Sequence, residues 1–291
     1  MKLTNLVIRL LIVFLLTFCI DGLYGQTETQ DFGFEPEVGQ AGKDVIWVPT
    51  PDELVNKMME IAKVSSDDMV IDLGSGDGRT VIAAAKLGAQ ALGIEYDINM
   101  IELSKKNAKD AGVSEKAKFI KADLFEYDLS EATVITMFLL PEINLTLRPQ
   151  LLKLKPGTRI VSNTFTMGEW KPDNKVTIDG NYESDYDEMY EDNWNSWTTA
   201  LLWIVPAKVD GIWQFRDGKI TIRQEFQMIN GTYKTGNKTT DIKDGRLKGN
   251  SITFSIDGEK YSGHINGDKT ITGTVNSGTT NKNWVATYSG I

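Results

Sequence analysis

A glycine-rich turn that follows a short apolar run constrains the fold of this chain more than any other feature. The run 69–71 ends in Asp72, and a helical pattern begins at Thr80. Three glycines lie between them at alternate positions: Gly74, Gly76 and Gly78. This order predicts a buried strand, a turn too tight for side chains, and a helix whose free N–H groups face the turn. Because the backbone of such a turn approaches a ligand closely, α/β proteins usually hold nucleotide-type ligands there.

The chain around this turn alternates between strand-like and helix-like segments. Apolar runs predict further strands at 91–94, 117–120, 132–138 and 158–162. Segments with helical patterning predict helices at 80–87, 99–111 and 145–154. This alternation predicts an α/β fold with a Rossmann-like, doubly wound and mostly parallel sheet. Two final strands are expected at 175–178 and 198–205.

Acidic side chains follow the first three strands, close to the point where each strand ends. They are Asp72, Glu95 and Asp123. A carboxylate at the tip of the second strand can accept hydrogen bonds from both hydroxyls of a ribose, and Asp123 can accept one from an adenine amino group. S-adenosylmethionine carries an amine, a ribose and an adenine, and its sulfonium cation gains from nearby negative charge. The trio therefore predicts this ligand rather than a dinucleotide, whose fingerprint runs Gly-x-Gly-x-x-Gly.

Two simpler interpretations stay open at this point. A glycine-rich turn can join a strand to a helix without holding a ligand, although three alternate glycines destabilise a chain unless the backbone needs the room. Either Glu95 or Asp123, taken alone, can be a solvated carboxylate at a strand end. Their joint placement favours a binding site.

With these residues, the chain resembles the class I S-adenosylmethionine-dependent methyltransferases over residues 44–207. The run 71–79 is also similar to that of the disruptor-of-telomeric-silencing-like and the mitochondrial ATP synthase c-subunit lysine methyltransferases. The resemblance implies methyl transfer from S-adenosylmethionine and an antiparallel edge to the sheet. It implies that one set of residues binds the cofactor: Asp72, Gly74, Ser75, Gly76, Gly78, Glu95 at the ribose, Asp123 at the adenine, and Leu124.

The segment before the first helix is a candidate lid. Residues 44–50 are expected to be extended, because proline disfavours a helical conformation in the residue before it. In the resembled families this stretch closes over the cofactor, so Trp47, Val48 and Thr50 are expected to line the lid, with Thr50 binding the cofactor. A hydrophobic staple is the structural alternative. Thr50 is followed by Pro51 and, three residues after Thr50, by Glu53. This spacing is typical of a capping box and predicts that Thr50 caps the first helix.

The segment after the fourth strand is the candidate for the chemistry. Amino-methylating enzymes often place an Asn/Asp-Pro-Pro-aromatic segment there, and the departure of residues 138–144 from it weakens any expectation of adenine or amide methylation. We expect Pro141 to stiffen a loop beside the transferable methyl group, and Glu142 or Asn144 to orient a nucleophile. A purely structural role is the alternative for each of these residues.

Charge narrows the choice of methyl acceptor. The net charge of −9 argues against a nucleic-acid substrate, because no basic stripe is present to neutralise phosphates. Acidic residues gather at 179–197 among tyrosines and tryptophans. This stretch is either a solvated insertion or a binding loop for a cationic partner, such as an amine or a lysine-bearing peptide.

Beyond residue 207 the patterning changes to short alternating strands. Asx-Gly or Ser-Gly pairs, which predict hairpin turns, lie at 217–218, 230–231, 244–245, 257–258, 266–267 and 277–278. Residues 208–291 are therefore expected to form a small antiparallel barrel or sandwich that Trp213 and Trp284 help to close. The one histidine, His264, is expected to be a surface or structural residue, and no metal-binding pattern stands out.

The amino terminus reads as a secretory signal peptide, residues 1–25, followed by a flexible lead-in at 26–43. Its clean apolar part is short for a membrane span. Cleavage would give an exported protein, periplasmic or secreted; without cleavage the leader would anchor the chain to a membrane. The leading hypothesis is a methyltransferase that acts on a small molecule or a protein lysine. The alternative is a non-catalytic envelope protein that keeps a methyltransferase scaffold and binds a ligand or partner through its β-domain.

Overall fold

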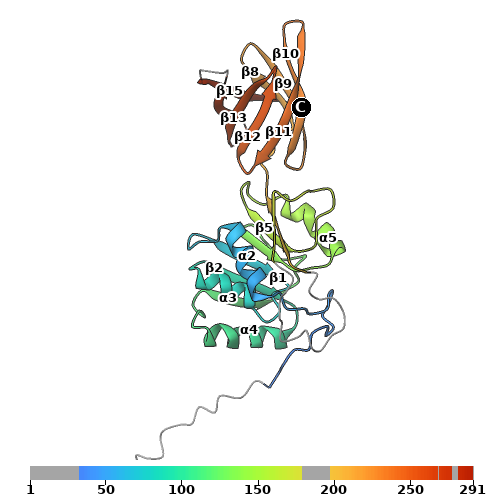
Figure 1. The fold of residues 1–291 in the computed structure, drawn as a ribbon, viewed down its shortest axis with the longest axis vertical. Helices are drawn as coiled ribbons and strands as arrows, with labels where there is room; N and C mark the ends of the chain where they lie inside the picture. Colours follow the sequence, from blue (N-terminus) through green and yellow to red (C-terminus); the bar gives the residue numbers. More distant parts are fainter. Residues whose placement is uncertain (1–32, 179–196, 268, 277–280, 291) are drawn as a thin grey trace, which may run out of the picture. The chain divides into compact units, whose positions relative to one another are not determined.

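The computed structural model describes residues 33–178, 197–267, 269–276 and 281–290. The first part of the described chain forms a seven-stranded sheet flanked by helices (Figure 1). In chain order the elements are α2 (Asp52–Ala62), β1 (Met69–Leu73), α3 (Arg79–Lys86), β2 (Gln90–Glu95), α4 (Ile98–Asp110), β3 (Ala117–Lys121), β4 (Val134–Met137), α5 (Pro141–Leu151), β5 (Arg159–Asn163), β6 (Asn174–Thr177) and β7 (Thr199–Ile204). The strands lie in the order β3-β2-β1-β4-β5-β7-β6. Strands β1 to β5 pair in parallel, whereas β7 runs antiparallel to β5 and β6. The predicted doubly wound, mostly parallel sheet is confirmed.

Alternate residues of the strands bury two apolar layers, one on each face of this sheet. Val70 belongs to the layer that α2, α3 and α4 cover, whereas Ile71 belongs to the layer that contains Leu147 of α5. Successive side chains of a strand point to opposite faces, so β1 contributes to both layers. Since helices cover both faces, the loops at the carboxyl ends of the strands are left to form a ligand site.

Three of the expected features fall outside the described residues. They are the leader at 1–25, nearly all of the acidic stretch, 179–196, and the hairpin turn at 277–278. All three therefore stay predictions. Within the part of the chain that is described, no helix has the length and the apolar character that crossing a membrane requires.

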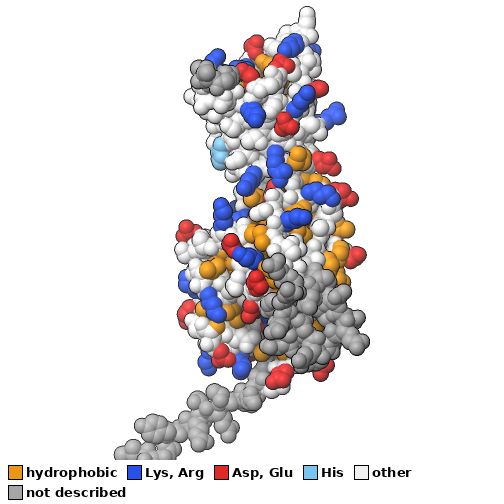
Figure 2. Space-filling view, in the orientation of Figure 1, with side chains coloured by type: hydrophobic (Ala, Val, Ile, Leu, Met, Phe, Trp, Pro, Cys, Tyr) orange, Lys and Arg blue, Asp and Glu red, His pale blue; other side chains and the backbone are white. Residues whose placement is uncertain are grey.

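The rest of the described chain is a closed barrel of eight antiparallel strands (Figure 1). The strands are β8 (Gly211–Phe215), β9 (Gly218–Glu225), β10 (Met228–Thr235), β11 (Lys238–Lys248), β12 (Ser251–Ile256), β13 (Glu259–Asn266), β14 (Thr270–Asn276) and β15 (Asn281–Gly290). Pairing of β15 with β8 closes the ring, and Trp213, Phe215 and Trp284 lie in its packed core. Basic and acidic side chains are interspersed on its outer surface (Figure 2), and His264 is exposed on β13. The barrel expected within residues 208–291 is confirmed.

Two of the expected hairpin turns lie inside barrel strands instead. The pair 230–231 is in β10 and the pair 244–245 is in β11, and the strand register shifts at both places. A Cβ atom on Gly231 would collide with the carbonyl oxygen of Thr221, and one on Gly245 with that of Ile229. These glycines therefore allow a close approach of neighbouring strands at irregular pairings, a role that glycine also has in strands. The pairs at 217–218, 257–258 and 266–267 lie at or beside hairpin turns, as predicted.

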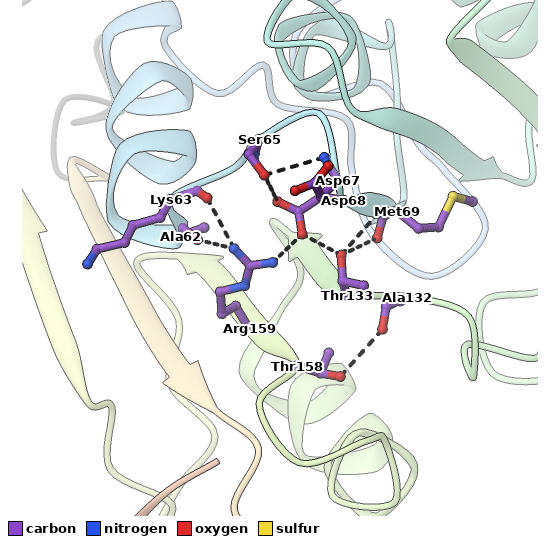
Figure 3. A network of polar contacts seen from close by, with 10 residues as sticks. All are labelled: Ala62, Lys63, Ser65, Asp67, Asp68, Met69, Ala132, Thr133, Thr158 and Arg159. Atoms are coloured by element: carbon purple, nitrogen blue, oxygen red, sulfur yellow. Dashed lines mark hydrogen bonds and ion pairs between the residues drawn. The ribbon is translucent and has the colours of Figure 1, made fainter. Parts of the chain in front are cut away.

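A polar network joins α2, β1, β4 and β5 at the amino ends of the strands (Figure 3). The Arg159 guanidinium forms an ion pair with Asp68 and donates hydrogen bonds to the carbonyl oxygens of Ala62, at 2.7 Å, and Lys63, at 3.1 Å. Thr133 Oγ1 donates to Asp68 Oδ1 at 2.7 Å. Burial opposes ionisation of Asp68, but the bonds from Thr133, the Ser65 N–H and Arg159 outweigh it and lower its pKa. The network lies at the edge of the sheet opposite to the carboxyl ends, so its role is structural.

Arg159→Met is expected to lower the free energy of unfolding by about 3 kcal/mol at neutral pH, because it leaves the buried Asp68 carboxylate without its counter-charge. The folded-state pKa of Asp68 is depressed, so the stabilisation is present above the ordinary pKa of about 4 and is lost as the pH falls below it. Urea denaturation at neutral and acidic pH measures both effects.

The matched control is Lys57→Met, which removes an exposed i,i+3 ion pair with Glu60. This change is expected to cost less than about 0.5 kcal/mol at either pH. Equal losses for the two variants, or a loss for Arg159→Met that does not shrink in acid, would contradict the role assigned to the network.

Candidate active site

A cavity lies at the carboxyl ends of the central strands, where the strand order reverses between β1 and β4. Reversal points of this kind are where open α/β sheets bind their ligands. Most of the lining residues come from three places: the segment 40–50, the glycine turn after β1, and the residues at or after the ends of β2, β3, β4 and β5. All described lining residues lie between Gln40 and Trp197, so the barrel contributes none of them.

The glycine turn has the conformation that its sequence predicts. Gly74, Gly76 and Gly78 have φ angles of 74°, 51° and 83°, in the region that favours glycine. A Cβ atom on Gly76 would lie 2.6 Å from the indole nitrogen of Trp47. Gly74 and Gly76 line the cavity, whereas Gly78 is the N-cap of α3 and does not. The turn therefore needs glycine both for its backbone and for the close approach of the segment that carries Trp47.

Asp72 ends β1 at the cavity and is only 5% exposed. Parallel pairing sets it beside Thr136 of β4, whose hydroxyl donates a hydrogen bond of 2.6 Å to Asp72 Oδ1. Burial raises the pKa of Asp72 to about 7; the Thr136 bond opposes this shift, and the negative charges of Glu95 and Asp77 add to it. A ligand that brings a positive charge would favour the ionised carboxylate.

Backbone N–H groups hold the carboxylate of Glu95 at the end of β2. Its Oε2 accepts from the N–H of Gly76 at 2.9 Å, and its Oε1 accepts from those of Tyr96 and Asp97 at 2.7 and 3.0 Å. The Gly76 bond fixes the distance between Glu95 and the glycine turn. Both therefore face the cavity together, as the sequence predicted.

Asp123 lines the same cavity and has a partner that the sequence did not predict. Its Oδ2 lies 2.5 Å from Lys43 Nζ, and its Oδ1 accepts from the N–H of Phe125 at 2.9 Å. These two bonds hold the pKa of Asp123 below its usual range. Leu124 lines the cavity beside it.

The segment that carries Lys43 is a small hairpin, although the sequence suggested a flexible lead-in up to residue 43. Ala41 bridges to Ile46, and backbone hydrogen bonds join Trp47 to Gly39 and Gln40. This hairpin is visible only in the backbone pairing of the structure, because the sequence of the segment has no alternation of apolar and polar residues that would predict strands.

The predicted lid residues Trp47, Val48 and Thr50 all line the cavity, but the predicted capping box is wrong. Helix α2 begins at Asp52, its N-cap is Pro51 rather than Thr50, and no side-chain cap bond is found there among the described residues. The hydroxyl of Thr50 instead lies 3.4 Å from Asn163 Nδ2, and its carbonyl oxygen accepts from Arg79 at 2.9 Å. Arg79, which sequence reasoning missed, also binds the Asp77 carboxylate and so ties the lid segment to the glycine turn.

The residues expected to orient the nucleophile do not line the cavity. Pro141 is the first residue of α5 rather than part of a loop, so that expectation is wrong; proline is favoured at this helical position because its missing N–H would have no partner there. Glu142 is exposed in the first turn of α5. Asn144 is fully buried and donates from Nδ2 to the carbonyl oxygens of Phe165 and Thr166, at 3.2 and 3.4 Å. Their assignment as catalytic residues stays a prediction.

Three aromatic side chains stand at the same end of the cavity, after β4, after β5 and before β7. The ring centres of Phe138 and Phe165 are 6.0 Å apart, and Trp197 lies 5.4 Å from Phe138 and 6.1 Å from Phe165. We call these residues the aromatic wall. Met137, Leu139 and Leu140 line the cavity next to it, so the lining that follows β4 is apolar throughout. Sequence reasoning missed the wall, because its members are far apart in the chain.

The chemistry of the cavity fits a cationic nucleoside ligand. Three carboxylates from three neighbouring strands face it, and the buried hydroxyl of Ser75 has no hydrogen-bond partner among the described residues. A tight glycine turn admits the ligand close to the backbone. Negative charge favours a sulfonium or ammonium group, so S-adenosylmethionine matches both the donors and the charge of the site.

Several known proteins with similar sequences are methyltransferases. The ANTKMT methyltransferase domain matches residues 72–174. A protein-lysine N-methyltransferase of Saccharolobus islandicus is 48% identical over 141 residues, which are 47% of this chain and 88% of that protein. The human lysine N-methyltransferase of the ATP synthase c-subunit is 32% identical over 167 residues, 56% of this chain and 71% of that protein. A crystal structure of an RNA methyltransferase from Salinibacter ruber has 43% identity and a TM-score of 0.48, and covers 56% of this chain and 96% of that one.

Proposed function

Because the chain belongs to the S-adenosylmethionine-dependent methyltransferase family that includes these lysine N-methyltransferases, we propose that it methylates lysine side chains of proteins. The cofactor is S-adenosylmethionine. The lysine acceptor is the finer part of the proposal, and one feature of the site carries it: the apolar end of the cavity formed by the aromatic wall and its neighbours.

An apolar acceptor end suits an amine in two ways. A lysine ammonium must lose a proton before its nitrogen can attack, and removal from water lowers the pKa of an ammonium group. As the nitrogen takes the methyl group it gains positive charge, which the faces of Phe138, Phe165 and Trp197 stabilise. A hydroxyl acceptor would need a base to remove its proton, and neither the aromatic wall nor Met137, Leu139 and Leu140 supplies one.

The residues of the chain contribute mainly by holding the reactants. Bound S-adenosylmethionine supplies a methyl group that its sulfonium sulfur already activates. Asp72 is proposed to bind the ammonium group, Glu95 the ribose hydroxyls and Asp123 the adenine amino group. The lysine nitrogen forms a bond to the methyl carbon as the bond from that carbon to sulfur breaks, and the proton lost beforehand goes to solvent. In-line displacement of this kind depends on alignment, which the walls of the cavity provide.

The other acceptors and the non-catalytic alternative have weaker support. Kinship with lysine N-methyltransferases does not favour a non-catalytic protein. A small amine would fit the same apolar end, and the dialysis step of the labelling experiment distinguishes it from a protein lysine. The role of the barrel and the location of the protein, including export through a leader at 1–25, stay predictions.

Incubation of the full-length protein with a host extract and S-adenosylmethionine that carries a labelled methyl group is expected to label proteins at lysine. Peptide mass spectrometry after the reaction maps the modified residues. Parallel samples are treated with protease, treated with ribonuclease, or depleted of small molecules by dialysis. Label confined to RNA, or label lost on dialysis, would overturn the proposed acceptor. Gly76→Val is the negative control, since a Cβ atom at residue 76 would collide with Trp47 on the cofactor side of the cavity.

A further inference from the structure

We propose that Asn144 and Thr164 are positioning residues that set Phe165 in the aromatic wall and so control how the acceptor binds. This inference rests on the proposed function and adds to it the residues that shape the acceptor subsite. The wall itself contacts the acceptor; the two positioning residues act through it.

The backbone at Thr164 has a conformation that its side chain disfavours. Its φ angle is 57°, in the left-handed region, where a β-branched residue is a rare exception. Strained residues persist only where surrounding contacts hold them, and they gather at functional sites. The consequence at this position is a sharp turn directly after β5, in which the N–H of Phe165 donates to the carbonyl oxygen of Asn163 at 2.6 Å. The chain turns here, and Phe165 joins the wall.

Three separate elements hold this turn. From β7, the carbonyl oxygen of Thr199 accepts from the N–H of Thr164 at 2.7 Å. From the lid segment, the hydroxyl of Thr50 lies 3.4 Å from Asn163 Nδ2. From α5, Asn144 Nδ2 donates to the carbonyl oxygens that follow the turn. The turn is therefore fixed from the strand that begins beside Trp197, from the lid and from the helix after β4.

Asn144 is costly for a residue that only fills space. It is fully buried, and its Oδ1 has no hydrogen-bond partner among the described residues. An unpaired buried oxygen destabilises a protein, so leucine of similar size would pack there at lower cost. What leucine lacks is the Nδ2 group that binds the backbone of Phe165 and Thr166. The amide of Asn144 therefore has a function that leucine cannot supply: it holds the backbone that carries Phe165.

Contact with the acceptor explains why the position of Phe165 matters. The wall is built from segments next to β4, β5 and β7 that meet at one end of the cavity, so a shift of Phe165 changes its distance to both other rings. Cation–π and apolar contacts depend on the approach of the ring face, and a misplacement of about 1 Å at a reacting centre can cost a hundredfold in rate. Asp72 and Glu95 lie on β1 and β2 and Asp123 follows β3, whereas the turn follows β5.

The test compares Asn144→Leu and Thr164→Gly with wild type, using the full chain and a peptide that carries the lysine mapped by the labelling experiment. Asn144→Leu removes the Nδ2 bonds to the backbone of Phe165 and Thr166. Thr164→Gly removes the hydroxyl that donates to Asn163 Oδ1 at 2.9 Å and gives the backbone of the turn more conformations. Both variants are therefore expected to lower kcat/KM for the peptide by about ten- to a hundredfold. The dissociation constant for S-adenosylhomocysteine, measured by calorimetry, is expected to stay within about twofold of wild type, since no cofactor carboxylate is altered. Thr164→Gly relieves the left-handed strain, so its unfolding midpoint is expected to stay at or above that of wild type.

This combination separates positioning from simple destabilisation. Phe165→Leu is expected to reproduce the loss in kcat/KM, while Thr146→Ala, an exposed change on α5, leaves it unaltered. A Thr164→Gly variant with wild-type kcat/KM would overturn the inference, as would an Asn144→Leu variant that is folded and fully active. The labelling of wild type is measured before the variants are compared. If wild type methylates no lysine, the proposed function is wrong; if it does and the variants keep wild-type kcat/KM, only the positioning role is wrong.

Discussion

Asp72→Asn is expected to make the cofactor-free protein more stable at alkaline pH while weakening its binding of S-adenosylmethionine about 10- to 150-fold. The loss of affinity follows from replacing a charge-assisted hydrogen bond to an ammonium group with a neutral one. The gain in stability follows from burial: the pKa of Asp72 is about 7 in the folded chain and about 4 in an unfolded one.

The sign of the pH dependence follows from these two values. Between about pH 4 and pH 7 the unfolded chain has lost a proton that the folded chain keeps, so the stability of wild type falls as the pH rises. The full loss corresponds to at most about 4 kcal/mol and is complete above the folded-state pKa. Asparagine does not ionise there and keeps an oxygen that can accept from Thr136, so this fall should be missing from the variant.

Thermal unfolding from about pH 5 to about pH 8.5, together with calorimetric titration of S-adenosylmethionine, measures both effects. Asp67→Asn is the control, because it removes the same charge from an exposed site. It should leave the pH profile and the affinity unchanged. If the stability of wild type and of Asp72→Asn falls in parallel with rising pH, the buried, high-pKa state of Asp72 is wrong.

The cofactor side of the cavity could be predicted from the sequence because each of its residues is tied to its own strand. Asp72, Glu95 and Asp123 follow β1, β2 and β3, and parallel pairing brings the ends of those strands to one edge. The three alternate glycines of the turn indicate its left-handed backbone by themselves. Local sequence signals were sufficient on this side because the parallel sheet brings the strand ends, and the residues after them, together.

The acceptor side could not be predicted in this way. Phe138, Phe165 and Trp197 are held together by contacts between segments distant in the chain, and none follows a recognisable pattern. Lys43 meets Asp123 from a stretch that reads as a polar lead-in. Arg79 sits next to the glycine turn, yet only the folded structure joins it to the lid through Thr50. These contacts depend on tertiary approach rather than on local propensity.

Some local signals were present but had two meanings. A proline after the fourth strand is compatible with a loop and also with the first turn of a helix, and Pro141 has the second role. Glycine after Asx is compatible with a hairpin turn and with a bulge, and Gly231 and Gly245 lie where the register shifts. In both cases strand pairing or helix packing decides between the meanings, and neither can be read from a few adjacent residues.

Gly76→Val is expected to abolish measurable binding of S-adenosylmethionine. Valine is unfavourable at the φ angle of 51°, and its Cβ would lie 2.6 Å from the indole nitrogen of Trp47 and 2.9 Å from the neighbouring ring carbon. The turn or the lid segment must move, and the N–H of residue 76 then no longer holds Glu95 in place. Calorimetric titration measures the binding, and circular dichroism checks that the variant is folded.

Two further variants separate the clash with Trp47 from the strain of the backbone. Gly112→Val places valine at a φ angle of 70° with no atom within 4 Å of the new Cβ, so it is expected to cost about 1–2 kcal/mol of stability and no cofactor affinity. In Gly76→Ala, adding Trp47→Ala removes the atoms in conflict and should restore part of the lost affinity, although Trp47→Ala alone weakens binding. Absence of any such rescue would show that the conformation of the turn, rather than the approach of the lid, is what requires glycine at this position.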